Sequence, residues 1–160
     1  MSTGLDAVMD GALRGRVAVV GLGEVASGDD GAGVRLVRAL RRRRRGCRCV
    51  EAGTAPERHL CGLGREELDA VLLVDAVDFG GAAGAVGWWG TEEIRARYPQ
   101  VGTHRLSLGL MARALSGEGR TRVWLLGVQP GSMRRGAGLS GPVARTCGGL
   151  LRLLCGVLRD

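Results

Sequence analysis

The sequence predicts a single α/β domain, a three-layer α/β/α sandwich in which helices cover both faces of a mostly parallel sheet. Apolar runs at residues 17–20, 71–74 and 123–128 have the continuous hydrophobic character of strands buried on both faces. Segments with helical signals separate these runs, so strands and helices alternate along the chain. A chain of 160 residues is long enough for one such domain, spanning 1–160, with its own core.

The remaining elements follow from local signals. Residues 1–15 form an N-terminal extension, expected to be flexible or helical. Asp29 or Asp30 is expected to cap a helix that runs to about Arg44, because a short acidic side chain stabilises a helix start. The other expected elements are a strand at 47–50, a broken helix at 57–68, an extended piece at 85–89, helices from Thr91 and His104, and a terminal helix at 140–158.

Composition excludes several classes of protein. The chain has no lysine, so it contains no P-loop, Schiff-base or general-base lysine. The formal net charge of +7 includes a run at Arg41–Arg45, which is expected to be a solvated helix end, or second a surface for an acidic protein partner. Aromatic residues make up only 3% and do not interleave with the arginines, which argues against nucleic-acid binding.

The cysteines and the hydropathy pattern predict a cytoplasmic protein. Five cysteines, an odd number, without a recognisable signal peptide indicate reduced thiols, and no cysteine spacing forms a four-ligand zinc site. No uninterrupted apolar stretch approaches the length of a membrane span, so no membrane association is expected.

Two carboxylates and an imidazole stand where an α/β fold places functional groups. Asp30 follows the first strand, Asp75 ends the most apolar strand, and His104 is expected to open a helix. Together they form an O,O,N donor set that suits a cation and leaves positions open for substrate. Each residue also has a purely structural interpretation, as a helix cap, a turn former or a polar residue at a helix start.

A dinucleotide site is the competing interpretation. The loop from Gly21 to Ala26 matches a loose Gly-x-Gly-x-x-Ala fingerprint, and Glu51 near the next strand end could bind a ribose. This would make the chain a nucleotide-binding oxidoreductase. However, Asp29 and Asp30 occupy the helix start at which a pyrophosphate would bind, and their charges would repel it.

The order of the motifs resembles one protein family. The blocks are Gly21-x-Gly23 with Asp29-Asp30-Gly31-x-Gly33, then Val74-Asp75-Ala76, His104 with Gly109, Gly127-Val128-Gln129-Pro130 and Gly138-Leu139-Ser140. In this order they resemble the hydrogenase maturation endopeptidases, which trim the C-terminal extension of the nickel-iron hydrogenase large subunit. The resemblance runs from about Val17 into the final helix.

The resemblance implies roles for individual residues. Asp30, Asp75 and His104 fall on the family's nickel-contacting positions, where they would also be catalytic, and Gly53-Thr54 falls on a turn near the substrate cleft. Nickel would arrive already bound to the large-subunit precursor. No organic cofactor is expected, and the protease is expected to be a monomer. The family usually has Asn where this chain has Glu24.

The reaction expected from this resemblance is hydrolysis by water. No serine or cysteine occupies a strand-to-helix elbow suited to a nucleophile, so either nickel or a carboxylate of Asp30 or Asp75 would activate the water. A non-catalytic nickel checkpoint or scaffold with the same fold is a further alternative, for which Glu24 is the suggestive change.

Overall fold

Five strands form one sheet in the computed structural model, which describes residues 2–98 and 107–158. Their order across the sheet is β2-β1-β3-β5-β4; β4 pairs antiparallel with β5, and the other neighbours are parallel. The strands are β1 (Val17–Leu22), β2 (Arg48–Gly53), β3 (Ala70–Ala76), β4 (Val86–Gly90) and β5 (Arg122–Val128). This arrangement confirms the predicted mostly parallel sheet.

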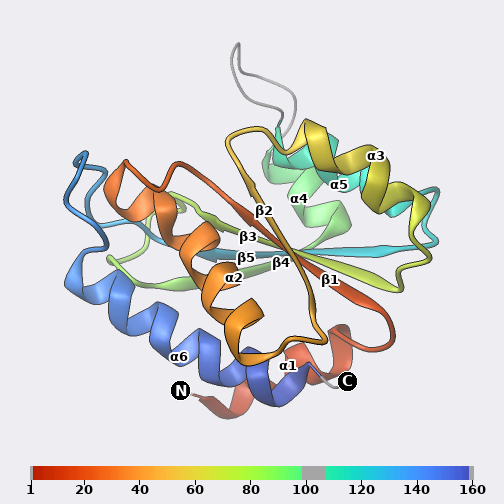
Figure 1. Cartoon of the computed structure of the whole chain (residues 1–160), viewed down its shortest axis with the longest axis horizontal. Helices are drawn as coiled ribbons and strands as arrows, with labels where there is room; N and C mark the ends of the chain where they lie inside the picture. Colours follow the sequence, from red (N-terminus) through yellow and green to blue (C-terminus); the bar gives the residue numbers. More distant parts are fainter. Residues whose placement is uncertain (1, 99–106, 159–160) are drawn as a thin grey trace.

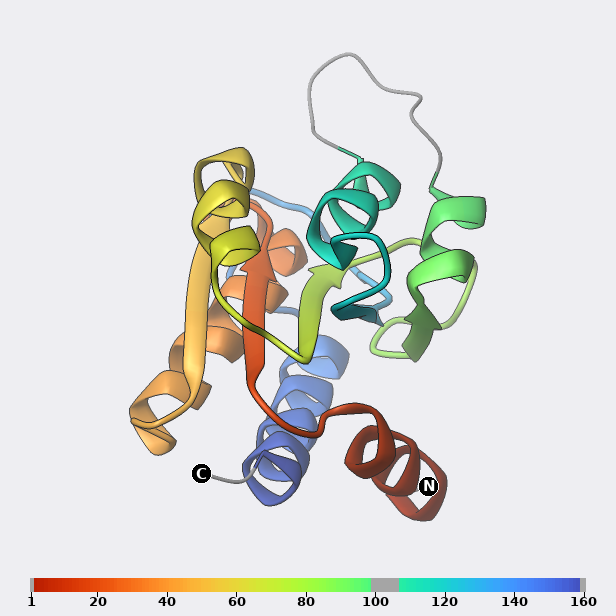
Figure 2. The same ribbon diagram turned by 90° about the vertical axis from the view of Figure 1, so that its right-hand side faces the viewer.

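Helices cover both faces of the sheet, as the sequence predicts. Figure 2 shows α3, α4 and α5 on one side and α1 and α6 on the other, and Figure 1 shows α2 beside α6. The helices are α1 (Ser2–Ala12), α2 (Ala32–Arg43), α3 (Glu57–Arg65), α4 (Thr91–Arg97), α5 (Leu108–Ser116) and α6 (Gly141–Val157). Helix α1 lies within the segment 1–15, so most of the N-terminal extension is helical.

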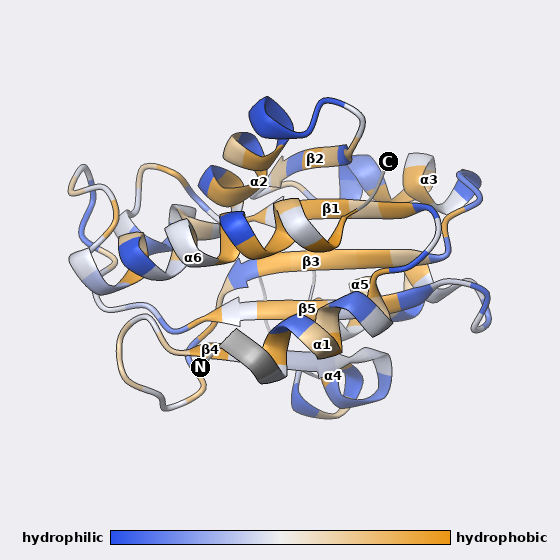
Figure 3. Ribbon diagram, turned by 90° about the horizontal axis from the view of Figure 1, so that it is seen from below, coloured by the Kyte–Doolittle hydropathy of each residue, from blue (hydrophilic) through white to orange (hydrophobic). Residues whose placement is uncertain are grey.

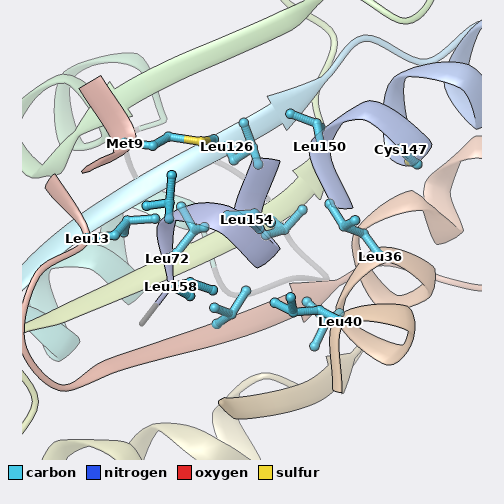
Figure 4. Packing of buried hydrophobic residues seen from close by; sticks show 14 of the residues in the cluster. Met9, Leu13, Leu36, Leu40, Leu72, Leu126, Cys147, Leu150, Leu154 and Leu158 are labelled. Carbon is cyan, nitrogen blue, oxygen red and sulfur yellow. The ribbon is translucent and has the colours of Figure 1, made fainter. Parts of the chain in front are cut away.

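Each face of the sheet has its own hydrophobic core. On one face Met9 of α1, Leu36 of α2 and Leu154 of α6 pack against Leu72 and Leu126 of the sheet (Figure 4). On the other face the core lies under α3, α4 and α5. In Figure 3 the central strands are hydrophobic over most of their length, and β3 turns hydrophilic at its carboxyl end. Burial of the β3 side chains stops there, which leaves Asp75 at the rim.

Two helix starts differ from the sequence prediction. A 3-10 turn, η1 (Gly28–Gly31), precedes α2, and neither Asp29 nor Asp30 caps that helix. The Asp29 carboxylate binds the segment after β5, and the Asp30 carboxylate accepts from the Glu24 N–H earlier in its own loop. The helix expected to open at His104 begins at Leu108, with the Ser107 hydroxyl accepting a hydrogen bond from the Leu110 amide. His104 itself lies outside the described residues.

Glycines bring the start of α2 into backbone contact with the sheet. A Cβ on Gly33 would lie 2.1 Å from the Val74 carbonyl oxygen and 2.7 Å from that of Leu22. A Cβ on Gly21 would lie 2.6 Å from the Gly33 carbonyl oxygen, so the two glycines face each other across the same contact. Any side chain would push α2 away from the ends of β1 and β3. The glycine pattern of this segment therefore serves packing of the chain on itself.

Substituting Gly33 with Ala should destabilise the fold by about 3 kcal/mol, because the new methyl group overlaps two backbone carbonyls that cannot move aside. Gly62→Ala in α3 is the control, since a Cβ there meets no atom within 4 Å and alanine favours a helix by about 1 kcal/mol. Chemical denaturation measures both free energies of unfolding. A Gly33→Ala protein as stable as the parent would contradict the close packing.

Candidate functional site

Asp30 and Asp75 lie at the same edge of the sheet. Asp30 belongs to the η1 turn that follows β1, and Asp75 is near the carboxyl end of β3, the strand beside β1. The η1 turn contacts β3, and Gly33 just after it touches the Val74 carbonyl. The carboxyl edge of a parallel sheet is where α/β proteins bind ligands. The structure thus places both predicted acids at the carboxyl edge of the sheet.

A backbone amide holds the Asp30 carboxylate. The Glu24 N–H donates to Asp30 Oδ2 at 2.7 Å, and Asp30 is only 8% exposed. A Cβ on Gly23 would lie 1.9 Å from the Asp30 carbonyl oxygen, so that loop can close on η1 only with glycine. The Glu24 side chain folds back on its own loop, where Oε1 accepts from the Ala26 N–H at 3.1 Å. Residue 24 therefore holds Asp30 through its backbone.

Asp75 lies near an aromatic cluster. The rings of Phe79 and Tyr98 pack edge-on against Trp89, with centroids 5.4 and 6.3 Å away, and Arg97 lies over the Trp89 ring. Burial raises the pKa of the Tyr98 hydroxyl; the Arg97 charge opposes this rise and the charge on Asp75 adds to it.

His104 falls in residues 99–106, outside the part of the chain that the structure describes. The described residues on either side of that segment are joined, since the Gly109 N–H donates to the Tyr98 carbonyl at 3.2 Å. A Cβ on Gly109 would lie 2.4 Å from the same carbonyl oxygen, so only glycine allows this approach. The described residues Tyr98 and Gly109, which flank the segment that carries His104, are therefore bonded to each other.

The Gly53-Thr54 turn lies beside the Asp30 loop. Gly53 has a φ of +58°, a conformation that favours glycine, and its carbonyl accepts a hydrogen bond from the Gly23 N–H at 3.0 Å. Thr54 is exposed to solvent. The turn that the resemblance places near the substrate is thus bonded directly to the loop that carries Asp30.

Within residues 2–98 and 107–158, no three His, Cys, Asp or Glu side chains gather closely enough to bind a metal ion. The ligand set predicted from sequence includes His104, so the described part of the chain contributes only its two carboxylates. Carboxylate and imidazole groups together are donors that suit a divalent transition metal.

The most connected polar group at this edge is Asp29, for which the sequence suggested no link to another loop. Its side chain is fully buried and accepts four hydrogen bonds of 2.7–2.8 Å, from the Gly131 and Ser132 amides and from the amide and hydroxyl of Ser140. Burial would raise the pKa of Asp29, but these hydrogen bonds outweigh it and hold the pKa below its ordinary value. Ionised Asp29 thereby ties the segment after β5 to the η1 turn.

Gln129 performs a second linking role that the sequence did not reveal. Its side-chain oxygen accepts from the Phe79 and Gly81 amides, and its Nε2 donates to Asp78 at 3.0 Å. The Gln129 and Gly80 hydrogen bonds lower the pKa of Asp78, which is an exposed loop residue. This buried amide fixes the loop after β3, immediately beyond Asp75.

A family model for the hydrogenase maturation protease HycI matches residues 34–156. The chain belongs to the hydrogenase maturation protease family. It is therefore a peptidase by family. Asp75 and His104 fall inside the matched range, and Asp30 lies just before it. No curated protein sequence matches the chain.

Solved structures agree with this assignment. The maturation protease HycI from Thermococcus kodakarensis superposes with a TM-score of 0.83 at 24% identity, over 96% of this chain and 99% of the other. The maturating endopeptidase HybD from E. coli has a TM-score of 0.75 at 27% identity, over 91% and 93% of the two chains. The fold predicted from sequence is thus confirmed.

The competing sites lack support. Glu51, the expected ribose ligand, is bound by Arg38 and Arg41 of α2, and the space in front of Gly23 is filled by the Asp30 backbone. A hydrogen bond with Cys47 and burial both raise the pKa of the Cys49 thiol. Burial and the negative charge of Asp29 raise the pKa of the Cys147 thiol to about 11. Both thiols are therefore protonated at neutral pH and poor nucleophiles.

No helix in the described ranges is long and apolar enough to span a membrane. The run at Arg41–Arg45 is largely solvent-exposed, as expected, although Arg41 binds Glu51 and Arg44 binds the Leu158 carbonyl.

Asp29→Asn should destabilise the protein by about 3 kcal/mol at pH 7, because an amide NH₂ would face backbone donors in place of a carboxylate oxygen. The lowered folded-state pKa means that ionised Asp29 stabilises the fold above 3.8, its ordinary value, and that this contribution is lost as pH falls through the folded-state pKa. The difference between parent and variant should therefore shrink in acid.

Denaturant titrations at several pH values measure this difference, with Asp10→Asn as control. Asp10 pairs with Arg14 on the surface of α1, and such pairs contribute about 0–1 kcal/mol. A destabilisation by Asp29→Asn no larger than that of Asp10→Asn would disprove the anchoring role.

Proposed function

We propose that this protein removes the C-terminal extension from a nickel-loaded nickel-iron hydrogenase large-subunit precursor, with Asp30, Asp75 and His104 contacting the substrate's nickel. The observation that carries the proposal is the placement of Asp30 and Asp75 at one edge of the sheet in a chain of the hydrogenase maturation protease family. His104 joins them through the family resemblance; the described residues Tyr98 and Gly109, which flank its segment, are hydrogen-bonded to each other.

The donor set suits nickel as a feature of the substrate. Two carboxylates and one imidazole leave coordination positions for ligands that the precursor supplies. Recognition of nickel would let the protease distinguish a loaded precursor from an empty one, because binding at the edge then depends on the metal. The protease needs no organic cofactor in this scheme.

Hydrolysis would use water directly. A carboxylate of Asp30 or Asp75 accepts a proton as water adds to the scissile carbonyl carbon. The C–N bond then breaks, and the proton passes to the departing amine nitrogen. Nickel bound to the precursor would orient this strand, and in the alternative scheme it would itself polarise the scissile carbonyl or the water. Gly53-Thr54, bonded to the Asp30 loop, would line the approach of the peptide as substrate-binding residues.

Asp30→Asn, Asp75→Asn and His104→Ala should each abolish processing of nickel-loaded precursor, with loss of more than about a hundredfold in rate, because each removes one donor to a shared cation. Melting temperature should stay within a few degrees of the parent for Asp75→Asn and His104→Ala. Gel electrophoresis and mass spectrometry of the precursor C-terminus follow the reaction.

His59→Ala is the control for the histidine, since His59 lies on α3, away from the matched motifs, and should process at the parent rate. If two of the three site variants also process at the parent rate, the shared site is wrong. If the parent protein and the variants all bind the precursor and none of them cuts it, the protein is a scaffold instead.

Glu24→Gln should change nickel-dependent processing less than about threefold. Glutamine keeps the side-chain oxygen that accepts from the Ala26 amide, and Asp30 is held by the residue 24 backbone, which the substitution leaves in place. The rate of precursor cleavage measures the effect. A loss above about tenfold, or about 1.4 kcal/mol, would instead make the Glu24 carboxylate part of the site.

A further inference from the structure

The segment from Gly131 to Gly138, here termed the rim loop, is an exposed loop that the fold holds firmly. Residues 131–137 are all solvent-exposed, and Figure 1 shows the loop ahead of α6 projecting past the start of α2. Met133 is 48% exposed, one of two large hydrophobic side chains so exposed among the described residues; the other is Val8. The rim loop itself adds nothing to either core.

The anchors of the rim loop all lie on the segment that carries Asp30. Asp29 binds the amides of Gly131 and Ser132, and its own N–H donates to the Ser132 carbonyl at 2.8 Å. Farther along, the Gly136 N–H donates to the Ala26 carbonyl at 2.9 Å. The rim loop is therefore fixed at both ends against the loop between β1 and α2.

Gly28 allows the loop between β1 and α2 to approach the rim loop as closely as these hydrogen bonds require. Gly28 has a φ of +56°, and a Cβ there would lie 2.6 Å from the Ser132 carbonyl oxygen and 3.1 Å from the Arg134 amide nitrogen. Burying a carboxylate completely costs several kcal/mol in desolvation unless hydrogen bonds compensate. The buried Asp29 carboxylate therefore depends on its hydrogen bonds to the rim loop, and these bonds hold the exposed loop in one conformation. A loop held in advance loses less entropy when a partner binds.

The exposed side chains of the rim loop define the partner's chemistry. Arg134 and Arg135 stand beside Met133, and no acidic side chain among the described residues lies within ion-pair distance of either guanidinium. Arg135 donates only to the Ser27 hydroxyl, at 3.2 Å. Two uncompensated cations beside an apolar side chain fit an acidic protein surface with a small apolar hollow.

We propose that the rim loop is the docking surface for the large-subunit precursor, which binds it through an acidic surface while its C-terminal segment enters the edge at Asp30 and Asp75. This inference rests on the proposed function, and it assigns the protein–protein contact to residues that the metal site does not include. Asp29 acts as a positioning residue, because it joins the docking surface to the turn that carries Asp30.

A triple variant, Met133→Ser/Arg134→Glu/Arg135→Glu, tests the docking surface in steady-state cleavage of nickel-loaded precursor. The expected result is a KM raised at least tenfold with kcat within twofold of the parent, because only binding remote from the reacting bond is lost. The parent KM should also rise with salt, and that dependence should weaken in the variant.

The matched control is Val8→Ser/Arg42→Glu/Arg45→Glu. Val8 has the same exposed fraction as Met133, 48%, and Arg42 and Arg45 are exposed arginines at the far end of α2. An unchanged KM in the rim-loop variant would overturn the proposal, as would an equal rise in the control, which would indicate general charge attraction. If the rim-loop variant keeps the parent KM but, unlike the parent, no longer binds phosphatidylglycerol vesicles, the rim loop binds a membrane surface instead.

A direct binding measurement separates this inference from the proposed function. If the parent cleaves the precursor and the rim-loop variant binds it equally well by calorimetry, the docking surface is wrong and the protease function stands. If the parent neither binds nor cleaves the precursor, the proposed function fails, and the docking proposal fails with it.

Discussion

The buried carboxylate of Asp29 holds the functional edge of this protein together. It receives four hydrogen bonds from the segment between β5 and α6, and the same residue sits in the turn that presents Asp30. Two loops far apart in the sequence therefore share one charged anchor. Because the hydrogen bonds depress the pKa of Asp29, the anchor is ionised and at full strength at neutral pH.

Backbone contacts through glycine complete the edge. Gly21 and Gly33 let the start of α2 approach the ends of β1 and β3, and Gly109 lets the start of α5 approach the Tyr98 carbonyl. The result is an edge whose acids are set by backbone geometry. Such preorganisation is what a site needs to recognise a metal carried by another protein, because no reorganisation has to accompany binding.

The fold could be predicted because its strands are continuous apolar runs buried on both faces. This signal is local, so it can be recognised without knowing which other segments contact the strand. The sequence also placed Asp30 after the first strand and Asp75 at a strand end, where the structure has them, while their role as ligands stays a prediction. It misjudged Asp29, because a short acid before a helix looks like a cap, and the donors that use it lie about a hundred residues away. The linking role of Gln129 was missed for the same reason: its partners are in another loop.

Under the proposed function, nickel on the precursor licenses cleavage by this protein. Purified protein can be incubated with nickel-loaded and nickel-free large-subunit precursor and analysed by intact mass spectrometry. We expect a single C-terminal cut in the loaded precursor and none in the empty one. Equal cleavage of both forms would contradict metal recognition, and cleavage of neither would contradict the assigned substrate.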